Sequence, residues 1–143
     1  MSTFSDQHKR NDALYVIFLA LLAATPALAT DMYLSAIPII ADEWNVGKDL
    51  INLSLVFWFI AFSCFLLVFG PVSDKYGRKP VLISGLSVFV LSTFLCALSQ
   101  NPTQIILFRI LQGMAAAAPS AMAMAICRDK YDGKQRQKVL AYI

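Results

Sequence analysis

The stretch "AATPALATDMYLSAIP", residues 23–38, decides between two folds. The "ALA" at 27–29 resembles a signal-peptidase site, and Lys9 and Arg10 supply the basic region that a cleaved leader needs. Cleavage there would release a secreted globular domain, which is the remote alternative. However, the apolar character resumes directly after Asp31 and three further apolar blocks follow. We therefore expect an uncleaved first span, with Asp31 inside the membrane.

The composition supports a membrane protein. Of 143 residues, 58% are hydrophobic and 15% are charged, against roughly 25% charged residues in soluble domains. Four apolar blocks each reach the roughly 20 residues that a membrane-spanning helix needs, and helices satisfy their own backbone hydrogen bonds in lipid. The sequence thus predicts an all-α polytopic helical bundle. Its expected helices cover residues 13–41, 50–72, 80–98 and 103–127.

A fifth apolar run begins at about residue 137 and stops with the sequence at 143. Seven residues make only about 10 Å of helix, which is too short to cross a bilayer. We expect residues 1–143 to be a truncated N-terminal six-helix half of a longer protein.

Lysine and arginine alternate in number between the blocks. There are two before the first block, then one, three and zero in the connections, and five after the fourth block. Connections rich in basic residues stay in the cytoplasm. The alternation predicts a cytoplasmic N-terminus and a cytoplasmic segment after the fourth helix.

Other classes of function have little support. No basic face combines with aromatic residues as nucleic-acid binding requires, and no nucleophile–base pair or phosphate loop stands out. Cys64, Cys96 and Cys127 lie in apolar runs without paired spacing, as buried small hydrophobic residues do. We expect no nucleic-acid partner, no catalysis, no metal and no cofactor.

Two charged residues lie inside the apolar blocks, Asp31 and Arg109. A charge at a helix centre costs about 2.5–3.5 kcal/mol even on lenient scales, so such residues usually face a bundle interior. Asp31 lies about 27 Å along the first helix and Arg109 about 10 Å along the antiparallel fourth. We expect the two to share a depth and to pair, with Asp31 as a protonatable switch. The alternative is that each side chain reaches the nearer membrane–water interface and has no function.

Two prolines give a weaker indication that the protein is a transporter. Pro26 and Pro119 lie in similar settings and are expected to interrupt the first and fourth helices. Matched interruptions of opposite orientation are typical of the inverted repeats of transporters.

The connection "GPVSDKYGRKPVL", residues 70–82, has an informative spacing. Gly70 and Pro71 are expected to weaken the end of the second helix, and Gly77 permits a tight turn. Asp74 lies among basic residues and is expected either to pair locally or to cap the N-terminus of a neighbouring helix. A charged turn that only sets orientation would explain the basic residues but not this spacing.

This connection resembles the motif between helices two and three of the major facilitator superfamily. The matching residues are Gly70, Asp74, Lys75, Gly77, Arg78 and Lys79, and Val72 replaces the usual Leu. "RILQG" is similar to the fourth-helix motif of that superfamily through Arg109, Gln112 and Gly113. "TDMYLSAIP" resembles the first-helix signature of Bcr/CflA-type drug:proton antiporters. Thr30, Asp31, Tyr33 and Pro38 match it, and Ser35 stands where that pattern has Pro.

The resemblance implies a twelve-helix transporter of the bacterial inner membrane, whose two halves rock around a central site. It implies proton-coupled efflux of small amphipathic or cationic compounds. The residues expected to couple protons to transport are Asp31 and Arg109. The residues expected to line the substrate cavity are Tyr33, Gln112 and Gly113. The connector would act as a conformational switch that contacts the missing C-terminal half, with Arg128 and Asp129 joining its charges. The alternatives are a facilitator importer or metabolite transporter, or a membrane fragment that does not transport.

Overall fold

Four α-helices joined by short turns make up the described part of the chain. The computed structural model describes the backbone of residues 2–130 and the side chains of residues 15–130. The helices are α1 (Ser2–Glu43), α2 (Lys48–Tyr76), α3 (Arg78–Ala97) and α4 (Pro102–Lys130). Each is long and apolar enough to cross a membrane, and even the 20 residues of α3 reach about 30 Å. The all-α membrane fold is confirmed. The run expected near residue 137 lies outside the described residues.

Several helix ends differ from the expected ones. α1 begins at Ser2 instead of residue 13, because hydropathy detects the membrane span and misses a polar extension of the same helix. α2 runs through Gly70 and Pro71 to Tyr76, so the expected weakening there is wrong. Pro26 and Pro119 also lie inside continuous helices, and the expected interruptions are wrong too. Transmembrane helices tolerate proline where neighbouring helices support the backbone.

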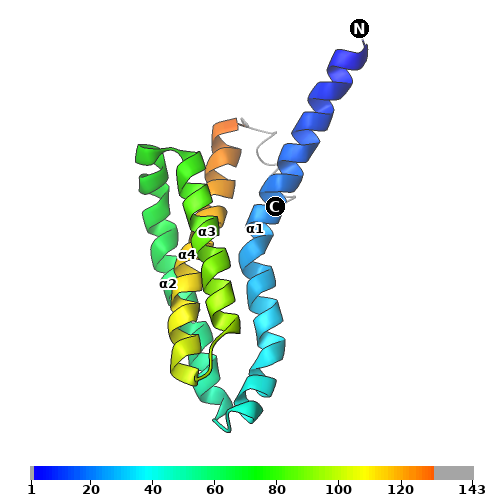
Figure 1. Ribbon diagram of the computed structural model, residues 1–143. Coiled ribbons are helices and arrows are strands. Elements are labelled where there is room, and N and C mark those ends of the chain that lie inside the picture. Colours follow the sequence, from blue (N-terminus) through cyan, green and yellow to red (C-terminus); the bar gives the residue numbers. More distant parts are fainter. Residues whose placement is uncertain (1, 131–143) are drawn as a thin grey trace.

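α4 lies at the centre of the described helices. It packs extensively on α2 and α3 and less on α1, and α1 leans away from the other three toward its amino-terminal end (Figure 1). Two glycines allow the close packing. A Cβ on Gly113 would lie 2.5 Å from the Trp58 carbonyl oxygen of α2, and one on Gly85 of α3 would collide with the Ala118 Cβ of α4. Small residues at helix contacts are typical of membrane bundles.

The turns place three segments at one end of the bundle. The amino-terminal end of α1, the α2–α3 turn and the carboxyl-terminal end of α4 lie at that end (Figure 1). Gly77 makes the α2–α3 turn with φ of 94°, a conformation that costs glycine nothing. These segments are those that carry most of the lysine and arginine residues, as the charge alternation predicts.

Candidate functional site

A chain of polar side chains joins all four helices around Arg109. The Arg109 side chain is buried, and its guanidinium carbon lies 3.4 Å from the centre of the Tyr33 ring of α1. Its Nη1 donates to Gln112 Oε1 at 2.9 Å, and Gln112 Nε2 donates to Thr93 Oγ1 of α3 at 2.7 Å. A guanidinium over an aromatic face is held by the electrons of the ring, and more strongly away from water. The cluster therefore holds a positive charge at a fixed place inside the bundle.

The Tyr33 hydroxyl extends this chain to α2. It lies 2.6 Å from Ser54 Oγ, which donates its own hydrogen to the carbonyl oxygen of Ile51 at 2.6 Å. Since the serine hydrogen is already used, the tyrosine must donate. Tyr33 thus contacts Arg109 with its ring and Ser54 with its hydroxyl, and fixes α1 against α2 and α4.

Arg109 is incompletely satisfied. Its Nε is buried and has no hydrogen-bond partner among the described residues, and no described carboxylate forms an ion pair with it. An unpaired buried charge is costly and typical of functional positions in membranes. The guanidinium is stabilised here by the aromatic ring and the amide oxygen of Gln112 instead of a counter-ion.

A groove of about 480 Å³ opens beside this cluster between α1, α3 and α4. Arg109, Gln112, Tyr33 and Thr93 are among its lining residues, and the exposed wall is almost entirely apolar. The remaining lining residues are Thr25, Leu28, Ala29, Met32, Ala36, Phe89 and Cys96. An apolar groove with few convergent polar groups has the composition of a small-molecule site.

The expected pairing of Asp31 with Arg109 is wrong. Asp31 is exposed and forms no ion pair within the described residues. Successive helical residues turn by about 100°, so Asp31 and Tyr33 point to nearly opposite sides of α1. Tyr33 takes the side that faces Arg109. The two residues are two positions apart, about 3 Å along the axis, so Asp31 still lies at the depth of the Arg109 cluster.

Gly113 has a different place from the other residues expected at a substrate cavity. Tyr33 and Gln112 line the groove, whereas Gly113 does not and packs on the backbone of Trp58. Trp58 is fully buried, and its ring stacks on Phe62 at 5.3 Å between centroids. Gly113 thus sets the distance between α4 and α2.

The connector residues meet α4 through Arg78. Arg78 Nη2 lies 2.7 Å from Asp74 Oδ1, and Arg78 Nε lies 3.1 Å from Asp129 Oδ2. Arg128 lies 3.9 Å from the Asp129 carboxylate at the edge of this cluster. The structure therefore places Asp129 against the connector, as the sequence analysis expects. Lys75 and Lys79 are exposed beside it, and Gly70 lies on the wall of a second groove.

This second groove, of about 350 Å³, runs between α2 and α4. Its polar lining residues are Asp74, Arg78 and Arg128. The other lining residues are Leu66, Gly70, Ala121, Met124 and Ala125. The groove places the connector charges beside an apolar surface.

Sequence reasoning missed the small hydroxyl residues of both clusters. Thr93 accepts from Gln112, Ser54 accepts from Tyr33, and Ser73 accepts from Arg78 Nη1. Serine and threonine are common in membrane helices and often bond to their own backbone. Only the positions of their side-chain partners on a neighbouring helix distinguish these three from the other hydroxyl residues.

Comparison with known proteins finds one family and relatives that are named as transporters or for drug resistance. Residues 17–143 match the sequence profile of the Major Facilitator Superfamily. An uncharacterized MFS-type transporter, YdgK of Bacillus subtilis (strain 168), is 36% identical over 125 residues, which are 87% of this chain and 31% of that protein. Multidrug resistance protein MdtL of Escherichia coli (strain SMS-3-5 / SECEC) is 34% identical over 124 residues, 87% of this chain and 32% of that protein. The chain spans about a third of the length of these relatives.

Proposed function

Because this chain belongs to the major facilitator superfamily, we propose that it is the N-terminal part of a proton-coupled exporter of small amphipathic or cationic compounds. Members of this family are membrane transporters, and the four helices that can span a bilayer agree with a multi-pass protein. The similarity to a protein named for multidrug resistance favours export over uptake. The partner we propose for this chain is a C-terminal half of the transporter, since the chain spans about a third of the length of its relatives.

The observation that carries the proposal is the buried Arg109 at the wall of an apolar groove. The groove offers contact area to an amphipathic compound, and the ring of Tyr33 and the amide of Gln112 offer polar contacts. Arg109 is a fixed positive charge, since a guanidinium keeps its proton. A site with a fixed positive charge needs a second group that changes its charge in order to couple protons to transport.

Asp31 is the group we assign to proton binding. It is a carboxylate within the α1 span, at the depth of Arg109 and on the opposite side of α1 from Tyr33. Asp31 is exposed on that side, so it can face a pathway that the rest of the protein completes. A proton and a cationic compound would compete there for the same carboxylate, which gives exchange of one for the other.

The connector supplies the proposed conformational switch. The connector residues at the end of α2 and the start of α3 are Gly70, Asp74, Lys75, Gly77, Arg78 and Lys79. Near them at the same end of the bundle are Arg128 and Asp129, which lie at the end of α4. We assign the groove between α2 and α4 to a helix end of the C-terminal half, which the Arg78 cluster would hold in one conformation and release in the other. The orientation proposed is a cytoplasmic N-terminus in the bacterial inner membrane.

Transport in everted membrane vesicles tests the proposal. The complete open reading frame that contains this chain is expressed, and ethidium accumulation is measured before and after nigericin removes the pH difference. The expected result is accumulation that requires the pH difference and is lost in Asp31→Asn. Asp42→Asn is the matched control, because Asp42 is an exposed carboxylate of the same helix that lies 11 residues beyond Asp31, next to the end of α1. Full proton-driven accumulation in Asp31→Asn would refute the assignment.

A further inference from the structure

The groove between α1, α3 and α4 has a positive charge in its wall and no negative one. Arg109 is the one charged residue among the described residues that line it. The Arg109 side chain is 5% exposed, Gln112 accepts from its Nη1, and its Nε has no acceptor among the described residues. A guanidinium has five N–H donors and keeps its charge. The described part of the chain therefore leaves this buried charge without a counter-ion.

Asp31 does not supply the missing negative charge. It points to nearly the opposite side of α1 from Tyr33, and it is not among the residues that line the groove, whereas Tyr33 and Ala36 of the same helix are. A cation bound at Asp31 would lie on another side of α1 from the groove. The two charged residues thus define two separate places at a similar depth.

The rest of the groove wall determines what else a ligand must offer. Leu28, Met32 and Phe89 contribute to an almost entirely apolar surface around a volume of about 480 Å³. Such a surface favours a ligand with an apolar body, because apolar contact removes both surfaces from water. A charge behind an apolar wall also acts more strongly on a ligand than it would in water, since the effective dielectric constant is lower there.

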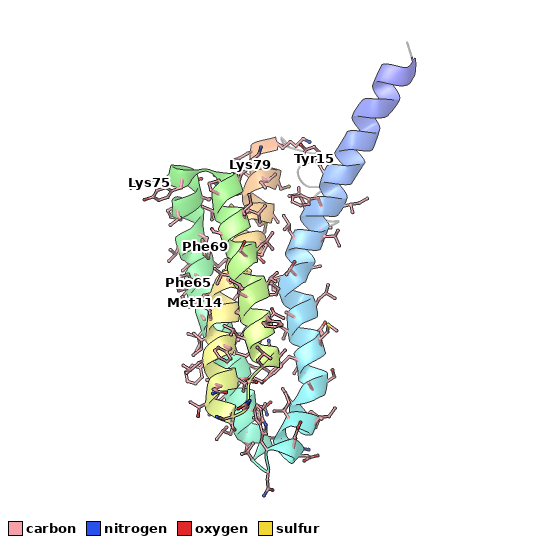
Figure 2. The ribbon with its side chains drawn as sticks, in the orientation of Figure 1. Tyr15, Phe65, Phe69, Lys75, Lys79 and Met114 are labelled. Atoms are coloured by element: carbon pink, nitrogen blue, oxygen red, sulfur yellow. The ribbon has the colours of Figure 1, made fainter. Side chains whose placement is uncertain are left out.

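A third groove shows what the bundle offers without a charge. Figure 2 shows Phe65, Phe69 and Met114 on the side of the bundle away from α1, and these residues line a groove of about 160 Å³ between α2, α3 and α4. No charged residue is among its described lining residues. An amphipathic compound would find apolar contact in both grooves, but only the groove at Arg109 would distinguish compounds by their charge.

We propose that the groove beside Arg109 binds amphipathic organic anions, with the anionic group toward the guanidinium and the apolar body against Leu28, Met32 and Phe89. The bound anion would take the place of the missing counter-ion, which a neutral compound of the same shape cannot do. The inference rests on the proposed function for the role of the groove as a cargo site, and it adds the class of compound that this groove takes. Cations remain assigned to Asp31, on the other side of α1.

Cys96 provides a reporter inside this groove. It lies three residues beyond Thr93 on α3, which places it on the same side of the helix and about 4.5 Å further along the axis. Both residues line the groove, whereas Cys64 and Cys127 do not. Because Thr93 accepts the hydrogen bond from Gln112, Cys96 lies within one helical turn of the Arg109 cluster. A ligand held there should cover the Cys96 thiol.

Protection of Cys96 from N-ethylmaleimide tests the proposal. The product of the complete open reading frame is labelled in phosphatidylcholine nanodiscs, alone, with 1-anilinonaphthalene-8-sulfonate or with N-phenyl-1-naphthylamine, and peptide masses report each cysteine separately. The two compounds share their ring system, and only the first carries a sulfonate. At equal amounts bound to the membrane, the sulfonate should slow the labelling of Cys96 by a factor about ten-fold greater than the neutral compound does. Equal protection by the two compounds would overturn the proposal.

Two variants separate the effect of the charge from that of the apolar wall. Arg109→Gln should remove the preference for the sulfonate, and an undiminished preference would overturn the assignment to Arg109. Ser84→Cys, in a Cys96→Ala background, places a thiol of similar size at the wall of the third groove. The two compounds should protect that thiol equally, and a preference for the sulfonate there would overturn the proposal.

The comparison of the two compounds on the unchanged protein does not depend on the folding of Arg109→Gln. It is also separate from transport. Preferential protection of Cys96 by the sulfonate, in a protein that does not accumulate ethidium in vesicles, would support the anion site and refute the proposed function. Proton-driven accumulation of ethidium with equal protection by the two compounds would refute the anion site alone.

Discussion

The contact between Tyr33 and Arg109 yields a quantitative prediction. Tyr33→Phe removes only the hydroxyl that donates to Ser54, and a hydrogen bond of this kind contributes about 1 kcal/mol. Tyr33→Leu also removes the ring that lies 3.4 Å from the guanidinium carbon of Arg109. A desolvated cation–ring contact contributes about 2 kcal/mol. The free energy of unfolding should therefore fall by about 1 kcal/mol in Tyr33→Phe and about 3 kcal/mol in Tyr33→Leu.

A double-mutant cycle separates the ring contact from the other effects of losing tyrosine. Tyr33→Leu and Arg109→Met are made singly and together, and unfolding in mixed micelles is followed by the fluorescence of Trp44 and Trp58. The expected coupling energy is about 2 kcal/mol. A coupling energy below about 0.5 kcal/mol would refute the argument that the ring replaces a counter-ion for Arg109.

Two further changes test the packing and the connector. Gly113→Ala places a Cβ 2.5 Å from the Trp58 carbonyl oxygen and should lower the free energy of unfolding by about 1–3 kcal/mol in the same assay. Gly47→Ala, with nothing within 4 Å of the added Cβ, should have a much smaller effect, and equal losses would contradict the close approach. Arg78→Gln removes two ion pairs to half-exposed carboxylates and should cost about 1 kcal/mol, less at high salt. Arg128→Gln should cost less than that, and a salt-independent loss in Arg78→Gln would contradict its electrostatic origin.

Much of the fold follows from the sequence because lipid imposes simple requirements. A long apolar run must be a helix in hydrocarbon, so the four spans are predicted from length and composition alone. The meeting of the connector with Asp129 also follows, because the alternating charges place the α2–α3 turn and the end of α4 at the same end. Helix ends are less predictable, since polar residues at the start of α1 continue a helix that hydropathy no longer detects.

The orientation of α1 could not be predicted in the same way. Residues on its bundle side, such as Leu19 and Ile37, are as apolar as residues on its exposed side, such as Leu21 and Ile39. In a soluble helix the exposed face is polar and reveals the rotation, but in a membrane both faces are apolar. The sequence therefore gives the depth of Asp31 but leaves its direction open. Tyr33, not Asp31, turns out to contact Arg109.

The central position of α4 has a consequence for how the protein is made. Of the four described helices, α4 has the least hydrophobic membrane window and the largest share of it covered by protein, and it carries both Arg109 and Gln112. Such a segment partitions poorly into lipid by itself. Because synthesis proceeds from the amino terminus, the α2–α3 hairpin has already left the ribosome when α4 emerges. The insertion machinery thus receives α4 when Thr93, Trp58 and Tyr33 are already available to accept it.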